Sequence, residues 1–443
     1  MATITSSGPQ IVSLKGPELK LELQRLRQTD NLTNWYYIGR TWLFLAMVIG
    51  ATVAFYHYQA ASGISFWWNV PVTFLAVLCV GAGQHQLAGA AHEAVHHILF
   101  KNRILNELAS DMLCMFPVFS STYQFRLHHL AHHQFINDPE RDPDQSQLRA
   151  SGHWLDFPVS KGTFLRTIAR QLWLPNLLRY IIVRARYSSL GQGNPYHRPG
   201  ERASRLPFVV NAVYVAAFWG VMAAGVRRQD PWLLSLAPLA MFALVAGVFA
   251  MLPARHFHTA RLHPAIPLKI SAILRASYFT MLITALCWVN YLTGAWTGPY
   301  FLMLWLLPLI TSFSLFMILR QVVQHGNGDR GFLTNTRVFF VNPLINYAVF
   351  PFGMDYHLPH HMFATVPHYR LRKLHELLLR YPEYRDQGVI VEGYFIPKGH
   401  PPEHPTVVDV LGPEFAMLSG GEISMDHSVL DDCKVDDRAE IQK

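Results

Sequence analysis

The stretch His92-Glu93-Ala94-Val95-His96-His97 decides how the rest of this sequence is interpreted. It follows directly on a long apolar run, Trp67 to Ala91. On an α-helix, residues four apart lie on one face, so His92 and His96 point the same way and His97 lies about 100° round. Imidazole is the commonest neutral metal ligand in proteins. The stretch therefore predicts a metal-binding group at the end of an apolar helix.

A second group of histidines follows at residues 128–133, which read His-His-Leu-Ala-His-His. His129, His132 and His133 fall at positions i, i+3 and i+4 of a helix, so they share a face. His128 lies on a different face, and we do not expect it to be a ligand.

The third group, residues 357–361, reads His-Leu-Pro-His-His. Proline is tolerated only in the first turn of a helix, so we expect His357 at the start of a helix and His360 and His361 just inside it.

One more histidine, His325, comes directly after the last long apolar run. Gln321 precedes it by four residues and shares its face, so we expect Gln321 to approach a metal directly or through water. The ten histidines are too many for one ion, whereas two ions with four or five nitrogen ligands each would use them all. Imidazole suits iron, copper, nickel and zinc alike, so the spacing does not name the metal. The predicted ligands are His92, His96, His97, His129, His132, His133, His325, His357, His360 and His361.

Ligating histidines usually donate their other ring N–H to a carboxylate or a carbonyl. Glu93 stands next to the first group, and the acidic run Asp138 to Asp144 follows the second. We expect Glu93 and, within the run, Asp142 to support metal ligands in this way. The alternative for the run is an ordinary solvated loop.

The composition indicates a membrane protein. The 443 residues are 51% hydrophobic and only 15% charged, against about 25% charged in a typical soluble domain. The net charge of +8 could suggest nucleic acid as a partner. We exclude nucleic acid because the basic residues lie in loops that flank apolar runs, as they do in membrane proteins. The four cysteines are scattered and form no metal-binding or disulfide pattern.

The apolar runs predict an all-α, polytopic bundle of four to six membrane spans. Each run approaches the roughly 20 residues that cross a bilayer. With an N-terminus in the cytosol, all three histidine groups and most Lys and Arg residues fall on the cytosolic side, in agreement with the positive-inside rule. We expect a cytosolic helical cap that carries a histidine-rich two-metal site. The six runs are Thr41–Tyr58, Phe66–Gly89, Pro207–Val226, Pro231–Leu252, Ile270–Leu292 and Pro299–Ile318.

Three regions follow from this pattern. Residues 1–40 are mixed polar sequence and predict a cytosolic N-terminal arm. Residues 41–419 hold the apolar runs and the histidines, and form the membrane domain. Residues 420–443 are acidic and poor in apolar residues, which predicts a disordered tail.

Taken together, these motifs resemble the membrane fatty acid desaturase and hydroxylase superfamily, whose three histidine boxes read HxxxH or HxxxHH, HxxHH and HxxHH. The boxes here are His92 to His97, His129 to His133 and His357 to His361. The resemblance extends to Gln324-His325-Gly326 and to Pro367-His368-Tyr369, and covers roughly residues 84–379. This chain has Gln321 where relatives carry an Asn or similar group, and Pro359 where the third box often carries Glu.

The resemblance implies a non-haem centre of two iron ions, held by the histidines, that uses O2 to attack an unactivated C–H bond. It implies a lipid acyl substrate and a desaturase-like domain at residues 41–419. The His-Pro-Gly-Gly motif of a fused haem electron donor is absent from the sequence, so we expect a separate donor of the ferredoxin or cytochrome b5 type.

Other functions fit parts of the sequence. A hydroxylase or ketolase of a fatty acid, a sphingolipid or a carotenoid would use the same residues as a desaturase. An intramembrane zinc protease would use His92-Glu93-Ala94-Val95-His96, which matches HExxH, but it leaves the other two groups unexplained. A transporter could relay protons through histidines, but these groups lie at the ends of the apolar runs and not at mid-membrane.

Overall fold

The computed structural model describes residues 13–190, 194–197, 204–257, 260–399, 401–415, 427–431 and 433–436. In these ranges the chain is helical, as expected, with one small exception. Strands β1 (Arg337–Phe340) and β2 (Val389–Glu392) form a two-stranded parallel sheet.

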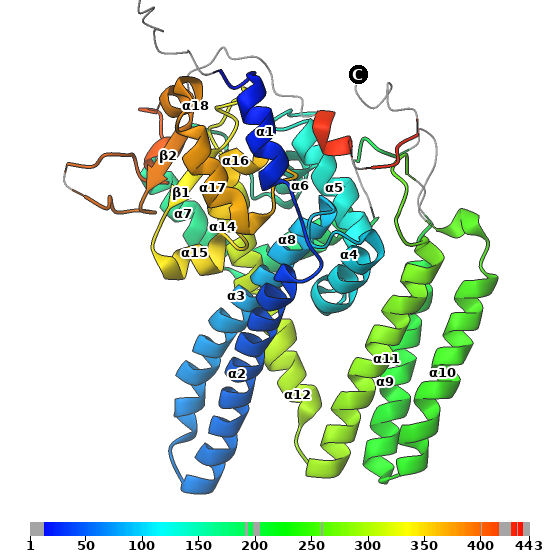
Figure 1. Cartoon of the computed structure of the whole chain (residues 1–443). Helices are drawn as coiled ribbons and strands as arrows, with labels where there is room; N and C mark the ends of the chain where they lie inside the picture. The colour runs from blue at the N-terminus through cyan, green and yellow to red at the C-terminus, as the bar shows by residue number, and fades with distance from the viewer. Residues whose placement is uncertain are drawn as a thin grey trace, which may run out of the picture.

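Six helical segments of the described chain are long and apolar enough to cross a membrane, which is the upper end of the predicted range. In Figure 1, α2 and α3 stand side by side, α9, α10 and α11 form a second group, and α12 lies between the two. The segments are α2 (Thr33–Ser62), α3 (Asn69–Val95, after the short η1, Phe66–Trp68), α9 (Leu206–Arg228), α10 (Pro231–Met251), α11 (Leu268–Thr293), and a composite segment of α12 (Thr297–Phe301), η5 (Leu302–Leu306), α13 (Leu307–Ile310) and α14 (Ser312–His325).

The helices α3 and α14 pack closely through a glycine. A Cβ atom built on Gly81 would lie 2.0 Å from Ser312 Oγ and 2.7 Å from the backbone nitrogen of Phe313. In the native chain the Ser312 hydroxyl donates to the carbonyl of Val77 at 2.6 Å. Gly81 thus allows two membrane helices to pack closely, and each of them carries histidines at or near its C-terminal end.

The remaining helices form a cap at one end of the membrane segments, where Figure 1 shows them gathered above α2 and α3. This is the predicted helical cap. Its longer helices are α4 (Arg103–Ser110), α5 (Thr122–Gln134), α6 (Pro143–Ser151), α7 (Lys161–Gln171), α8 (Leu174–Leu190), α15 (Pro343–Val349), α16 (His357–Met362), α17 (His368–Leu378) and α18 (Pro382–Gln387). The chain also has short helical turns: η2 (Asp111–Met115), η3 (Phe116–Val118), η4 (Ala254–His256), η6 (Met354–Tyr356), η7 (Asp409–Leu411) and η8 (His427–Leu430).

The N-terminal arm is more structured than its composition suggested. Helix α1 (Pro17–Leu26) buries Leu19 and Leu23 in the cluster that also contains Leu374 of α17. Helix α2 begins at Thr33, so the first membrane helix extends into the 1–40 segment. Residues 1–12 lie outside the described residues.

The C-terminal segment 420–443, expected to be a disordered tail, falls partly outside the described residues. Its described residues, 427–431 and 433–436, pack on other parts of the chain. Leu430 of η8 is fully buried beside Leu127 and Leu130 of α5. Val435 forms an antiparallel bridge with Leu262.

Candidate metal centre

Four helices converge on one region of the cap, and each brings histidines to it. Helix α3 carries His92 near its C-terminal end, and His96 follows as its C-cap residue. Helix α14 ends at His325. Helix α16 begins at His357, as the proline two residues later requires. Helix α5 carries all three histidines of the second group, and all of these side chains are buried.

The first set of histidines contains five imidazoles, and we call it group 1. One ring nitrogen from each lies within 4.8 Å of one ring nitrogen from every other. The Nε2 atoms of His96 and His129 are 3.0 Å apart, as are those of His133 and His360. Three elements distant in sequence therefore present their nitrogens to one small volume. Group 1 consists of His92, His96, His129, His133 and His360.

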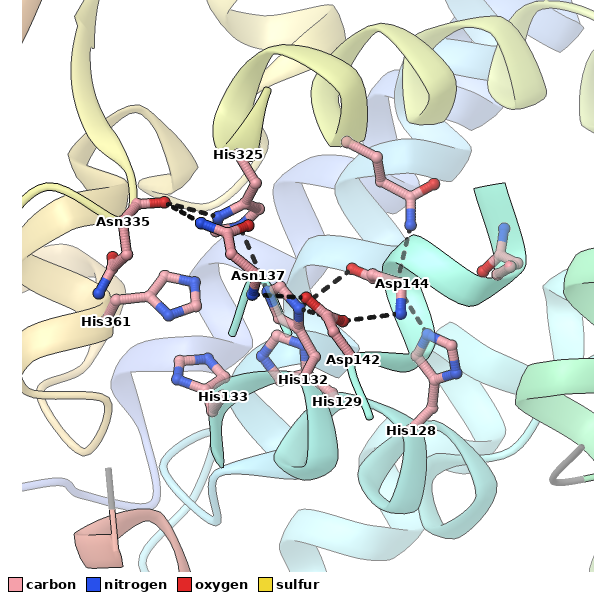
Figure 2. A network of polar contacts seen from close by, with 12 residues as sticks. His128, His129, His132, His133, Asn137, Asp142, Asp144, His325, Asn335 and His361 are labelled. Carbon is pink, nitrogen blue, oxygen red and sulfur yellow. Dashed lines mark hydrogen bonds and ion pairs between the residues drawn. The ribbon is translucent and has the colours of Figure 1, made fainter. Parts of the chain in front are cut away.

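A second set, group 2, lies beside the first. His132, His325 and His361 again have ring nitrogens within 4.8 Å of one another. His357 joins them, because its Nε2 is 2.9 Å from Nε2 of His325 and 3.1 Å from that of His361. Figure 2 shows His132, His133, His325 and His361 drawn together in one region.

This donor set fits metal ions. Eight of the nine imidazoles approach a neighbouring ring through Nε2, and a neutral imidazole has only one N–H to donate. His92 Nε2 is buried and has no hydrogen-bond partner among the described residues. A buried nitrogen left without a partner costs free energy, and a metal ion would supply that partner.

Burial keeps most of these imidazoles in the form that binds metals. It lowers the pKa of His129, His133 and His361 well below the usual histidine value, so these rings are neutral. His132 is different. Burial lowers its pKa too, but the carboxylates of Asp142 and Asp144 outweigh burial and raise it to about 9.

Asp142 lies against His132. Its Oδ1 is 3.0 Å from His132 Nδ1, so His132 directs Nε2 toward group 2. The same carboxylate is the N-cap of α6, accepting from the backbone N–H of Asp144 at 2.9 Å, and it also accepts from Asn137. Figure 2 shows Asp142 beside His132 in this network. One carboxylate thus starts a helix and orients a candidate ligand.

Gln321 is not in the direct contact with a metal position that we considered. It lies behind the acidic residues that surround His132. Its Nε2 donates to Asp144 Oδ1 at 3.0 Å, and its Oε1 accepts from the hydroxyl of Tyr180. Asp144 in turn contacts His128 Nε2 at 2.7 Å. In the described structure, Gln321 therefore supports the acidic residues around His132 and makes no hydrogen bond to a histidine.

Glu93 is buried in α3. In contrast to our expectation, it does not hydrogen-bond to a ligand histidine. Its Oε2 accepts from the backbone N–H of His368 at 2.7 Å. Its Oε1 is 3.8 Å from His92 Nδ1, which is too long for a hydrogen bond. Glu93 therefore ties α3 to the start of α17.

His97 lies apart from both groups, in contrast to the prediction. The prediction assumed a helix through His97, but α3 ends at Val95 and His97 has a positive φ of 59°. Its Nδ1 faces Glu107 of α4 at 3.8 Å. The end of the helix, which the histidine spacing does not reveal, turns this side chain away.

Other contributions to the site could not be found from the sequence. The backbone carbonyl of Asn335 lies 3.2 Å from His325 Nδ1 and also accepts from the Asn137 side chain at 3.0 Å. A backbone carbonyl is common to every residue, so no sequence signal marks the one at Asn335.

Comparison with known proteins gives two further findings. The chain matches the family described as "Fatty acid desaturase" over residues 65–268 and 227–392. These ranges contain all nine grouped histidines. The chain is also similar to a protein of Bradyrhizobium elkanii named dihydrorhizobitoxine desaturase, with 22% identity over 393 residues, which cover 87% of this chain and 86% of that protein. Because the family match spans well over half of the sequence and contains both histidine groups, this chain belongs to the fatty acid desaturase family.

Proposed function

We propose that this chain is an O2-dependent membrane desaturase that holds two iron ions and introduces a double bond into a lipid acyl chain. The observation that carries the proposal is the convergence of nine buried imidazoles into two adjacent groups. Family membership and the similar desaturase support a desaturase-type oxidoreductase. The apolar helices support a lipid substrate that reaches the site from the membrane.

Each group would hold one iron ion. Group 1 offers five nitrogens and group 2 offers four, with His357 included. Imidazole is a suitable ligand for iron, and its neutral form binds through one nitrogen while the other donates a hydrogen bond. His97 is left out of this ligand set because it faces Glu107.

A zinc protease is a poorer fit to the same residues. Group 1 adds three imidazoles to the His92 and His96 of the HExxH match, whereas a catalytic zinc needs an open position beside about three protein ligands. Glu93 would have to be the general base, yet its carboxylate is bound to the backbone of His368.

The reaction needs a strong oxidant, because side-chain acids and bases cannot break an aliphatic C–H bond. The iron ions would supply that oxidant from O2. The chain's own residues orient the ligands, as Asp142 does for His132, and exclude water from the site by burial. Removal of two hydrogen atoms from the substrate and reduction of O2 to two waters consume two electrons and two protons. We propose that a separate ferredoxin or cytochrome b5 type protein supplies those electrons.

We also propose that the site faces the cytosol. Both helix ends that carry histidines, those of α3 and α14, lie on the cap side. Short connections join the membrane helices at the other side, where Arg227 and Arg228 end α9. Most Lys and Arg residues thus lie with the cap, which the positive-inside rule assigns to the cytosol.

Mass spectrometry of a host that expresses the chain tests the reaction. Lipid extracts should gain acyl chains that lack two hydrogen atoms, and an equal amount of His361→Ala protein should not produce them. Products with an added oxygen atom would instead indicate a hydroxylase or a ketolase. The similar protein's name gives dihydrorhizobitoxine as its substrate, so the water-soluble extract should be measured as well. A desaturated product found only there would contradict the lipid substrate.

A further inference from the structure

Two buried arginines lie at the ends of the two membrane helices that carry candidate ligands. Arg126 is 2% exposed and Arg337 is fully buried. Each guanidinium donates hydrogen bonds to backbone carbonyls at the C-terminal end of one of these helices.

Arg126 comes from α5 and binds the end of α3. Its Nε donates to the carbonyl of Val95 at 2.9 Å, and its Nη2 donates to that of Ala94 at 2.7 Å. Its charge is balanced by a buried ion pair with Glu107. The two carbonyls lie between His92 and His96 in the chain, and Arg126 precedes His129 by one helical turn. Arg126 therefore joins the two helices that supply most of group 1.

Arg337 comes from β1 and binds the end of α14. Its Nη1 donates to the carbonyl of Val323 at 3.1 Å, and its Nη2 donates to that of Gly326 at 2.6 Å. The preceding residue, Thr336, donates to the carbonyl of Gln324 at 2.8 Å. Arg337 pairs with no acidic side chain in the part of the chain that the structure describes, so its partners there are carbonyls around His325.

Strand β1 also supports the third histidine box. Val338 is buried in one cluster with Leu358 and Met362 of α16. Arg337 therefore links His325, at the end of α14, to the helix that supplies His357 and His361. These residues belong to group 2.

The chemistry of a helix end explains why arginine suits both positions. The last four carbonyls of a helix lack intrahelical partners and carry a partial negative charge, which a cation stabilises. A guanidinium is a planar fork that can hold two carbonyls in a fixed geometry, whereas a lysine ammonium is a point charge on a flexible stem.

We propose that Arg126 and Arg337 are positioning residues, each of which sets the geometry of one metal position: Arg126 that of group 1 and Arg337 that of group 2. This inference rests on the proposed function, because it needs two metal positions. It adds that separate residues hold the two metal positions. Metal binding at one position can therefore be weakened without weakening it at the other.

Metal analysis of purified Arg126→Lys and Arg337→Lys proteins tests the proposal. Each variant should retain one tightly bound iron ion per chain and bind the other about 10–100-fold more weakly, the usual effect of removing support from a ligand. The His361→Ala background assigns the position. There, Arg126→Lys should remove the remaining metal, and Arg337→Lys should leave it in place.

Two further variants separate positioning from general stability. Thr336→Val removes only the bond to the Gln324 carbonyl, and should weaken the group 2 metal without unfolding the protein. Arg275→Lys changes a half-buried arginine that donates to the Ser120 carbonyl, just before the start of α5 and not at the C-terminal end of α3 or α14, and should keep both metals. Loss of both metals in parallel with a lower unfolding temperature, or retention of both, would overturn the proposal. Native protein that holds fewer than two metals would contradict the proposed function instead.

Discussion

His325 lies outside the three histidine boxes, and the structure places it at the centre of group 2. Its Nε2 is 3.2 Å from that of His132 and 2.9 Å from that of His357. We predict that His325→Ala loses iron and activity as severely as His361→Ala does. Gln321→Ala should have a milder effect, because Gln321 hydrogen-bonds to Asp144 and not to a histidine.

Iron analysis and turnover of the purified variants check this prediction. His404→Ala is the control, since His404 belongs to neither histidine group. It lines a separate cavity together with Phe340 and Tyr356. A His325→Ala protein that keeps both irons and its turnover would make His325 a structural residue.

The neighbours His96 and His97 should behave differently. His96 is a member of group 1, whereas His97 faces Glu107. We predict that His96→Ala loses the group 1 metal and that His97→Ala keeps both metals. Equal loss of metal in the two variants, measured on purified protein, would show that His97 is a ligand after all.

Asp142 combines two roles that one substitution can separate. Asn is as good an N-cap as Asp, so Asp142→Asn should leave α6 intact while it removes the charge beside His132. We predict metal binding about 10–100-fold weaker at group 2 and an unfolding temperature close to that of the native protein. Titration with iron measures the first and thermal unfolding the second. Asp138→Asn, which changes a carboxylate that pairs with Arg141 and Arg330, should leave metal affinity unchanged.

At this scale the sequence revealed which histidines could meet, because spacing on a helix fixes which side chains share a face. It did not reveal where helices end, and His97 was therefore misplaced. It also did not reveal partners that act through the backbone, such as the carbonyl of Asn335.

At the scale of the elements, the contact between α3 and α14 determines how close the histidines of one helix come to those of the other. Gly81→Ala would place its Cβ against Ser312 Oγ and the backbone of Phe313. We predict a loss of stability of about 1–3 kcal/mol, as is usual for overpacking, together with weaker metal binding. Thermal unfolding in detergent measures the first effect.

Gly50→Ala in α2 is the matched control, because a Cβ there meets nothing within 4 Å. It should be neutral or slightly stabilising, since alanine favours a helix over glycine. Equal unfolding temperatures for the two variants would show that close packing at Gly81 is not needed.

The six membrane helices were predictable because a helix must stay apolar over roughly 20 residues to cross a bilayer. The ends of these helices were harder to predict. Helix α2 begins at Thr33 and not at Thr41, because polar residues continue the helix into the cap. The short strands β1 and β2 were not predicted, because four-residue strands give almost no periodic signal.

At the scale of the whole molecule, the proposed orientation places the cap in the cytosol. Ala61 lies near the turn between α2 and α3, at the end of α2 away from the cap, and Gly162 lies in α7 of the cap; both are exposed. We predict that single cysteines at these positions, in a chain without its native cysteines, react with a membrane-impermeant thiol reagent from opposite sides. The cysteine at position 162 should react from the cytosolic side. Labelling of both from one side would contradict the arrangement of spans.

The central claim is that the two histidine groups hold two iron ions, and the metal content of the purified protein tests it most directly. Elemental analysis of the native chain should find two irons per chain, and His129→Ala and His361→Ala should each lower that number. One zinc ion per chain, or no bound metal in protein purified without chelators, would contradict the account.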